Sequence, residues 1–353
     1  MSADAAIQQV WYSRRPLWLF VLLVPLSGLF AGIAWLRRTA YARGLFSVVR
    51  LPRPVIVIGN ITVGGTGKTP FVIWLAQRLK SKGWQVGIVL RGYAGTSTTW
   101  PREVDADTDV GEVGDEAVLL ARQTRCIVVA GPDRVAAARR AIELGAEFVL
   151  SDDGLQHYRL GRDAEIAVMD ERRLLGNRWQ LPAGPLREPR SRLGKVDLIV
   201  MTRRAAISPP ATHDSRLAAH LPSDFPPSII AAAKLSQAVS LLDGSSRPLE
   251  SFQHGPVHAV AGIGNPEAFF EALRTAGLTV DARPLPDHAV PSAADIEFAD
   301  DAPVLMTQKD AVKCRSMADG RHWAIPLDLE LSEADAAAVD ALVKRLLKAG
   351  YRG

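Results

Sequence analysis

The sequence predicts an α/β protein with a mostly parallel sheet covered by helices on both faces, a second, smaller α/β domain and an apolar N-terminal helix. Two observations support this prediction. Short apolar runs typical of buried strands alternate with amphipathic helical patterns between residues 55 and 201. A cluster of prolines at 202–228 then precedes a second set of strand and helix patterns. We therefore expect a membrane-anchoring helix in 1–45, a core domain in 46–205 and a smaller domain in 206–353.

The N-terminal run from Pro16 to Leu36 carries no charged residue, and it is long enough for a helix to cross the hydrocarbon core of a bilayer. Trp18 and Trp35 lie near its ends, where interfacial aromatic residues are favoured. Arginines flank the run, and the larger number after it predicts that the following chain is cytoplasmic. A buried core helix is the alternative. Pro25 and Gly28 leave open whether the helix spans the bilayer or dips into one leaflet.

The composition is that of a folded protein, with 48% hydrophobic residues, 23% charged residues and a net charge of +4. This mild positive charge suits an anionic partner without choosing among nucleic acid, phospholipid and nucleotide. Nucleic acid is not expected, because the sequence has no recognition-helix pattern or aromatic stacking motif. Cys126 and Cys314 match no metal or redox spacing, which is typical of a protein in a reducing compartment.

A glycine-rich loop beginning after the strand at 55–58 organises the core. It ends in Gly67-Lys68-Thr69, and an apolar helical pattern follows. The glycines allow backbone N–H groups to surround phosphate oxygens, and the N-terminus of the helix faces the same anion. Lys68 can reach the β- and γ-phosphates, and Thr69 can bind Mg²⁺. Although Thr62 replaces the consensus glycine, we predict a P-loop NTPase-like core. Its nucleotide-binding residues are Thr62, Val63, Gly64, Gly65, Thr66, Gly67, Lys68 and Thr69.

The remaining elements follow from apolar periodicity. In the core we expect helices at 71–80, 115–124 and 134–144 and strands at 85–90, 126–130, 148–151, 166–169 and 198–201. In the smaller domain we expect strands at 258–260, 279–285, 304–307 and 323–325 and helices at 267–276 and 332–348. The long polar loop at 96–113 is more typical of a mobile or functional segment than of a core.

Two carboxylates, Asp152 and Asp153, directly follow the apolar strand at 148–151. In P-loop proteins this position lies at the carboxyl edge of the sheet, beside Mg²⁺. Either residue can hold the metal directly or through water, although Asp-Gly is also a common turn pair. Gln156 and His157 follow closely and can orient substrate or water.

Three further features are candidates for acceptor chemistry. Asp115 begins a helix, which suits both a favourable helix start and a carboxylate that accepts a hydroxyl proton. His288 is isolated in the sequence, and a lone histidine is more often structural. The segment 171–195 is rich in arginine and shaped as a loop by prolines, so it can contact phosphate.

The strand and Thr-Gln-Lys-Asp sequence at 304–310 loosely resemble the guanine-reading motif of GTPases. This motif lies far from the phosphate loop along the chain, and no clear Asp-x-x-Gly switch motif follows the first strands. A regulatory GTPase is therefore not favoured.

Taken together, these segments resemble the tetraacyldisaccharide 4′-kinase family, the lipid A 4′-kinases of Gram-negative bacteria. The shared motifs are GNITVGGTGKTP at 59–70, RGYAG at 91–95, VGDEAVLLA at 113–121, GPDR at 131–134, SDDGLQH at 151–157, LPAGPLREP at 181–189, AGIGNPEAFF at 261–270, PDH at 286–288 and TQKDAVK at 307–313. The resemblance covers nearly the whole chain. Two small departures are the extra alanine in RGYAG and Ala289, where a histidine or an aromatic residue is common.

The resemblance implies that ATP phosphorylates the 4′-hydroxyl of tetraacyldisaccharide 1-phosphate to give lipid IVA. It implies two α/β domains joined by a short two-stranded link, with the active site in the cleft between them. It also implies a lipid substrate reached from the cytoplasmic face of the inner membrane. The implied catalytic residues are Asp115 as base, His288 as its partner, and Lys68 and Arg187 as phosphate-stabilising cations. The candidate metal ligands are Thr69, Asp152, Asp153 and Glu188.

Two other functions remain open at this level: a membrane-attached P-loop NTPase acting as a switch or transport factor, and a nucleotide-sensing scaffold. A kinase needs a carboxylate that activates its acceptor, whereas a scaffold does not.

Overall fold

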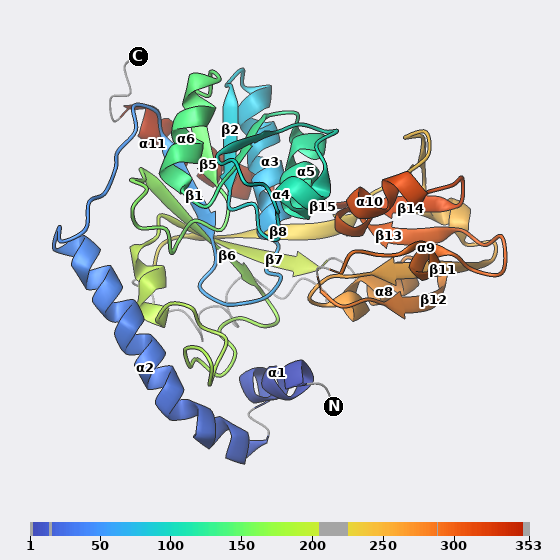
Figure 1. The fold of residues 1–353 in the computed structure, drawn as a ribbon, viewed down its shortest axis with the longest axis horizontal. Coiled ribbons are helices and arrows are strands. Elements are labelled where there is room, and N and C mark those ends of the chain that lie inside the picture. The colour runs from blue at the N-terminus through green and yellow to red at the C-terminus, as the bar shows by residue number, and fades with distance from the viewer. Residues whose placement is uncertain (1–2, 14–15, 205–224, 288, 349–353) are drawn as a thin grey trace.

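The computed structural model describes residues 3–13, 16–204, 225–287 and 289–348. The described residues form two β-sheets with helices packed around them, and an apolar helix lies to one side of the larger sheet (Figure 1). The predicted α/β fold, with a mostly parallel sheet and helices on both faces, is confirmed.

The larger sheet has the strand order β15-β8-β7-β6-β1-β5-β2-β4-β3. All neighbours are parallel except β3 with β4 and β15 with β8. Its strands are β1 (Val55–Gly59), β2 (Val86–Leu90), β3 (Arg102–Val104), β4 (Ile127–Ala130), β5 (Phe148–Ser151), β6 (Ala164–Asp170), β7 (Leu198–Arg204), β8 (Ser228–Leu235) and β15 (Leu327–Leu331). The helices that follow its strands are α3 (Lys68–Ser81), α4 (Val110–Val113), α5 (Asp115–Thr124), α6 (Arg134–Glu143) and α11 (Glu333–Lys348).

The smaller sheet has the strand order β10-β9-β14-β13-β11-β12. Its parallel centre is β12-β11-β13-β14. The strands are β9 (Ala238–Ser240), β10 (Ser246–Arg247), β11 (Pro256–Ala261), β12 (Thr279–Pro284), β13 (Val304–Thr307) and β14 (His322–Ile325). The accompanying helices are α8 (Pro266–Thr275), α9 (Ala293–Ile296) and α10 (Gln308–Cys314).

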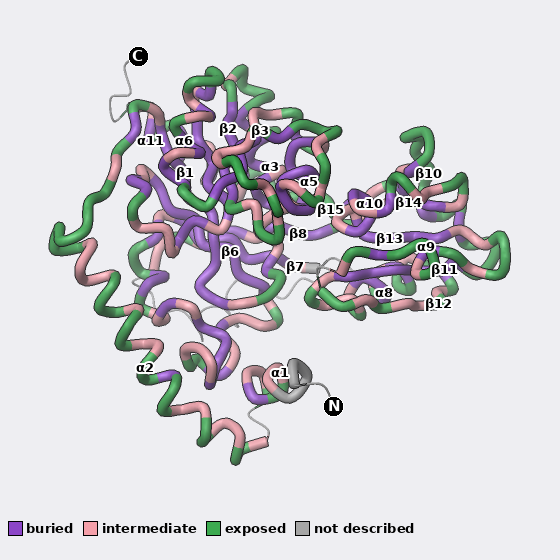
Figure 2. The backbone as a smooth tube through the Cα atoms, in the orientation of Figure 1, coloured by how far each residue is buried: buried purple, intermediate pink, exposed green. Residues whose placement is uncertain are grey.

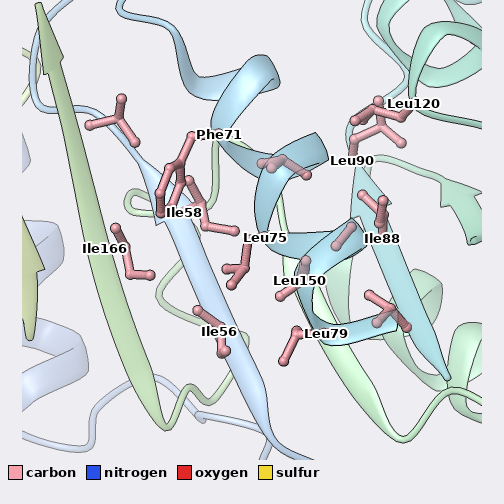
Figure 3. Packing of buried hydrophobic residues seen from close by; sticks show 14 of the residues in the cluster. Ile56, Ile58, Phe71, Leu75, Leu79, Ile88, Leu90, Leu120, Leu150 and Ile166 are labelled. Atoms are coloured by element: carbon pink, nitrogen blue, oxygen red, sulfur yellow. The ribbon is translucent and has the colours of Figure 1, made fainter. Parts of the chain in front are cut away.

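The central strand β1 shows why helices cover both faces of the larger sheet. All five of its residues are buried, and successive side chains point to opposite faces. Ile56 and Ile58 pack with α3, α5 and α11 on one face, while Val55 and Val57 pack with α6 on the other. Figure 3 shows the first of these clusters, and Figure 2 shows the buried strands running through the molecule. This two-sided core holds the loop after β1 rigidly at the carboxyl edge of the sheet.

Three elements beyond residue 206, two strands and one helix, belong to the larger sheet and its core. Strands β8 and β15 extend it, and α11 packs into the same core as α3. Arg78 on α3 donates two hydrogen bonds of 2.8 Å to Asp340 on α11. The sequence placed this part of the chain in the smaller domain. The expected boundary near residue 206 itself falls within 205–224, outside the described residues.

The chain passes between the two sheets along β8 and β15. These strands pair antiparallel from Leu235 opposite Leu327 to Ala231 opposite Leu331. Beyond them, the Ser236 N–H donates to the Pro326 carbonyl at 3.0 Å, just before the chain enters the smaller sheet. The antiparallel pair is a two-stranded link of the kind that the family resemblance implies.

The N-terminal region forms two helices, α1 (Ala3–Ser13) and α2 (Leu17–Ala42). Among the described helices, α2 alone is long and apolar enough to cross a membrane, and it is mostly exposed. Its exposure excludes the alternative of a buried core helix. Helix α1, which the sequence did not predict separately, contacts the arginine-rich loop. There the Trp11 indole N–H donates to the Pro182 carbonyl at 2.8 Å.

Candidate active site

The loop between β1 and α3 has the shape expected of a phosphate-binding loop. Gly64 and Gly67 adopt φ values of 103° and 82°, which side chains with a Cβ rarely adopt. A Cβ at Gly67 would also lie 2.7 Å from Thr202 Cγ2. From the end of β7, the Thr202 hydroxyl donates to the Thr66 carbonyl at 2.8 Å. The Asn60 side chain donates to the Thr66 hydroxyl at 3.2 Å. These contacts hold the loop in this conformation.

The first residues of this loop are held by the arginine-rich segment. Thr62 forms an isolated antiparallel bridge with Leu186. The Val63 N–H donates to the Pro185 carbonyl at 2.9 Å. This pairing is extended backbone, which any residue can adopt, so the structure explains why threonine replaces the consensus glycine at position 62. Because the Val63 N–H already has a partner, phosphate binding at this atom would require that bond to be exchanged.

Three charged groups gather where α3 begins. The Lys68 ammonium lies 3.6 Å from Asp153 Oδ1. Arg187 donates to both Asp153 oxygens, at 3.1 and 2.9 Å. Burial alone would raise the pKa of the Asp153 carboxyl, but the charges of Lys68 and Arg187 hold it at about 2. The structure therefore brings together three residues that the sequence assigned separately to catalysis and metal binding.

Asp152 has a contrasting environment. It is buried, and its Oδ1 atom has no hydrogen-bond partner among the described residues. Burial and then the negative charge of Glu116 raise the pKa of its carboxyl to about 7. Beneath it the Arg134 guanidinium donates to the Asp152 carbonyl at 3.0 Å, and burial lowers the pKa of this arginine to about 10. An unpartnered carboxylate oxygen beside the phosphate-binding lysine fits a divalent cation.

Glu188 lies in a different network. Its carboxylate accepts from Arg38 on α2 at 2.9 Å and from the Tyr158 hydroxyl at 2.5 Å. Burial and the hydrogen bond to Glu188 raise the pKa of Tyr158 to about 12. The sequence did not reveal that Glu188, which directly follows Arg187, connects the apolar helix to Tyr158. Its role as a metal ligand stays a prediction.

Asp115 begins α5 at the boundary between the two sheets. The preceding Gly114 has a φ of 88°, and a Cβ there would lie 2.2 Å from the Tyr93 carbonyl oxygen. Only glycine fits this close approach. The Asp115 Oδ2 atom lies 3.1 Å from the ammonium of Lys313 and 3.9 Å from that of Lys309. Both lysines come from α10, beside the smaller sheet.

These lysines are site residues that the sequence did not identify. Lys309 belongs to the Thr-Gln-Lys-Asp segment that loosely resembled a guanine-reading motif. The sequence could have indicated that these two lysines act together, because Lys309 and Lys313 are four residues apart and therefore share one face of a helix. Asp115 and Lys313 also line a cavity of about 560 Å³ between α5 and α10. His288 lies outside the described residues.

The two halves of the site are close enough to interact. Glu116, which follows Asp115, lies 3.8 Å from Lys309 and also adds to the raised pKa of Asp152. The phosphate loop and its carboxylates thus form one half, and Asp115 with the α10 lysines forms the other. Half-buried His157 lies near the first half, where partial burial and the charge of Arg134 lower its pKa to about 4, so it is neutral near pH 7.

Comparisons with known proteins identify the family of the chain. The sequence profile of the family described as "Tetraacyldisaccharide-1-P 4'-kinase" matches residues 19–348. The chain is 47% identical to the tetraacyldisaccharide 4'-kinase of Nitrosococcus oceani over 98% of this chain and 96% of that protein. It is 46% identical to the corresponding protein of Alkalilimnicola ehrlichii over 95% and 96%.

The fold is also similar to a crystal structure of LpxK from Aquifex aeolicus in complex with ATP. The TM-score is 0.76 at 29% sequence identity, with 93% of this chain and 99% of that chain covered. Since the family profile covers most of the chain and close relatives match along nearly their whole length, the chain belongs to the tetraacyldisaccharide 1-phosphate 4′-kinase family.

Proposed function

We propose that this protein transfers the γ-phosphoryl group of ATP to the 4′-hydroxyl of tetraacyldisaccharide 1-phosphate, giving lipid IVA. The observation that carries the proposal is the division of the site into two halves. Lys68, Arg187 and Asp153 gather at the phosphate loop, and Asp115 lies at the domain boundary beside a cavity. The names of the relatives supply the identity of the acceptor.

In the donor half, the loop N–H groups and the N-terminus of α3 bind the phosphates of ATP. Lys68 and Arg187 are paired with Asp153 in the structure, so they are already positioned at the loop. Bound phosphate draws these cations toward itself, and they stabilise the charge that spreads over the transferring group.

In the acceptor half, Asp115 accepts the proton of the attacking hydroxyl, which makes the oxygen a better nucleophile. The cavity between α5 and α10 gives a hydroxyl of the acceptor access to this carboxylate. The role of His288 as a partner of Asp115 stays a prediction.

The residues present fit Mg²⁺ as a cofactor. Asp152 would hold the ion through its unpartnered Oδ1 atom, directly or through water, and Thr69 would add its hydroxyl. Within the described residues no group of three or more His, Cys, Asp and Glu side chains forms a metal cluster. Mg²⁺ is usually bound by one or two carboxylates together with substrate phosphates. When bound, the ion neutralises phosphate charge.

We expect the pH dependence of stability to report on Asp152. Between pH 4 and pH 7 the folded state keeps a proton that an unfolded aspartate releases near its ordinary pKa of about 4. The folded state then binds more protons, so this residue makes stability fall as pH rises through that window. Asp152→Asn should remove this part of the slope in urea unfolding without Mg²⁺.

Mg²⁺ should restore stability to the wild type at high pH, because a cation competes with the proton for the carboxylate. The rise in Tm on adding Mg²⁺ is expected to be larger at pH 8 than at pH 6. An equal rise in Asp152→Asn would show that the ion binds elsewhere.

We further propose that α2 lies in the plane of the membrane, at the cytoplasmic face of the inner membrane. Three contacts tie α2 to the catalytic domain: the Phe20 ring lies 5.5 Å from the Trp179 ring, the Ser27 hydroxyl donates to the Gln180 carbonyl at 2.7 Å, and Arg38 pairs with Glu188. They span about 27 Å of helix. If α2 spanned the bilayer with these contacts intact, polar backbone of the loop would enter hydrocarbon. The opposite face, which includes Leu22, Leu29 and Leu36, is exposed.

Spin labels at positions 22, 29 and 36 should distinguish the two orientations. In a cysteine-free background on vesicles containing anionic lipid, an in-plane helix places all three labels at similar depth. A spanning helix separates successive labels by about 10 Å in depth. Depths that change steadily along the helix would contradict the in-plane arrangement.

Incubation with ATP, Mg²⁺ and tetraacyldisaccharide 1-phosphate in detergent tests the function. The expected product is heavier than the acceptor by one phosphate group. The alternative of a membrane-attached NTPase switch is not favoured by the family or by the separate acceptor carboxylate. It would produce ATP hydrolysis without that product.

A further inference from the structure

Lys313 makes three contacts from a buried position. Its ammonium nitrogen lies 3.1 Å from Asp115 Oδ2 and 3.7 Å from Asp310 Oδ1, and it donates to the Ala289 carbonyl at 2.8 Å. Its side chain is only 4% exposed. One N–H of the ammonium group thus donates to the Ala289 carbonyl, while the two carboxylate oxygens lie within ion-pair distance of it. These three partners lie on α5, on α10 and in the loop after β12.

Lys309, one turn earlier on α10, is less closely engaged with Asp115. It lies 3.9 Å from the same Oδ2 atom, and its side chain is 17% exposed. Both lysines approach one oxygen of the carboxylate, and Lys313 also donates to the Ala289 carbonyl in the loop after β12. Of the two, Lys313 lies closer to Asp115 Oδ2 and is more deeply buried.

The charged groups around Lys313 are deeply buried. Asp115 is 6% exposed and Asp310 is fully buried, so two carboxylates lie beside one ammonium group. A buried charge is costly unless it is paired and hydrogen-bonded. Asp310 is itself fixed, because its Oδ2 atom accepts from the Gly262 N–H at 3.0 Å and from the Thr307 hydroxyl at 2.6 Å. Through its ion pair with Asp310, the ammonium of Lys313 is held against the smaller sheet, and it reaches Asp115 from that side.

We propose that Lys313 is a positioning residue for phosphoryl transfer: it fixes the Asp115 carboxylate and ties it to the loop whose Ala289 directly follows His288. This inference rests on the proposed role of Asp115 as acceptor base. The acceptor base lies on α5, whereas its anchor lies on α10, so Asp115 is correctly placed only while the two sheets are docked. A displacement of about 1 Å at a reacting group can cost about 10²-fold in rate.

A double-mutant cycle tests this proposal by asking whether the effect of a Lys313 substitution on kcat depends on Asp115. A general structural role would not show this dependence. Lys313→Met should lower kcat by about 10²-fold and leave the KM for ATP unchanged, because the phosphate loop is untouched. In an Asp115→Asn background the same change should have little further effect on the residual rate, since the group that Lys313 positions is already inactive. Radiolabelled ATP makes these low rates measurable.

Lys234→Met is the matched control. Lys234 is also paired with a carboxylate, Glu330, but this pair is exposed on the two-stranded link. We expect wild-type kcat and KM for the control. If Lys313→Met does not fold, as judged by its thermal unfolding, Lys313→Gln serves in its place because its amide can still donate to the Ala289 carbonyl.

The outcomes separate this inference from the proposed function. Wild-type kcat in the Lys313 variant would overturn the inference. An equal fall in rate with and without the Asp115→Asn change would also overturn it, because Lys313 would then act independently of Asp115. A wild-type enzyme that forms no phosphorylated lipid would instead contradict the proposed function, before any variant is compared.

Discussion

Replacing Lys68 with alanine should lower kcat by about 10²- to 10³-fold, which is the typical cost of removing one preorganised donor to a developing charge. Lys68 begins α3, and its ammonium is held 3.6 Å from Asp153 at the mouth of the phosphate loop. Phosphoryl transfer depends largely on positioning and electrostatic stabilisation, so losing this charge removes much of the catalytic effect. Initial rates of lipid phosphorylation at saturating ATP would measure the fall.

Lys80→Ala is the control for this variant, because it removes a lysine from the same helix. Lys80 donates to the Thr124 and Arg125 carbonyls, away from the phosphate loop. We expect near-wild-type kcat for this control. Unchanged turnover in Lys68→Ala would contradict the assignment of the loop to ATP.

Replacing Asp115 with alanine should lower kcat by at least about 10²-fold while ATP still binds, because general-base catalysis is typically worth 10²- to 10⁴-fold. Along the chain, α3, β2 and the polar segment after β2 separate Asp115 from the phosphate loop. Titration with a fluorescent ATP analogue would check nucleotide binding, and lipid phosphorylation would report the rate.

Asp105→Asn offers a control in the same polar segment. Asp105 is exposed and accepts from the Thr108 hydroxyl at 2.8 Å within a local turn. Its replacement should leave kcat close to the wild-type value. Full activity in Asp115→Ala would remove this carboxylate from the mechanism and would also remove the basis for a positioning role of Lys313.

The features predicted correctly from the sequence are mostly local. The phosphate loop depends on glycines with positive φ and on the adjoining strand and helix, all within one short segment. The helix starting at Asp115 and the strand at 148–151 match the structure at both ends. Local periodicity is sufficient for such elements because their burial pattern is repeated along the chain.

The sequence could not show in the same way that β8 and β15 belong to the larger sheet. Strand β8 buries Ile229, Ala231 and Ala233, and alanine gives little strand signal. Its partners are β7 and β15, and β15 lies more than 90 residues later, at Leu327. Such pairing is set by tertiary contacts that no local pattern records.

The same limit applies to the site. Lys313 reaches Asp115 from the other side of the domain boundary, and Arg38 reaches Glu188 from the apolar helix. Both contacts join segments far apart in the sequence. Family resemblance indicated which motifs belong to the site, but only the fold shows which side chains of those motifs meet.

The most direct test of the account is to measure ADP and phosphorylated lipid in the same reaction. With ATP, Mg²⁺ and tetraacyldisaccharide 1-phosphate, we expect one phosphorylated lipid for each ADP, with little ADP formed when the acceptor is omitted. In Asp115→Asn both products should fall together, because the carboxylate acts on the acceptor. Rapid ADP formation without phosphorylated lipid would contradict the assignment of this protein as a lipid kinase and indicate an NTPase.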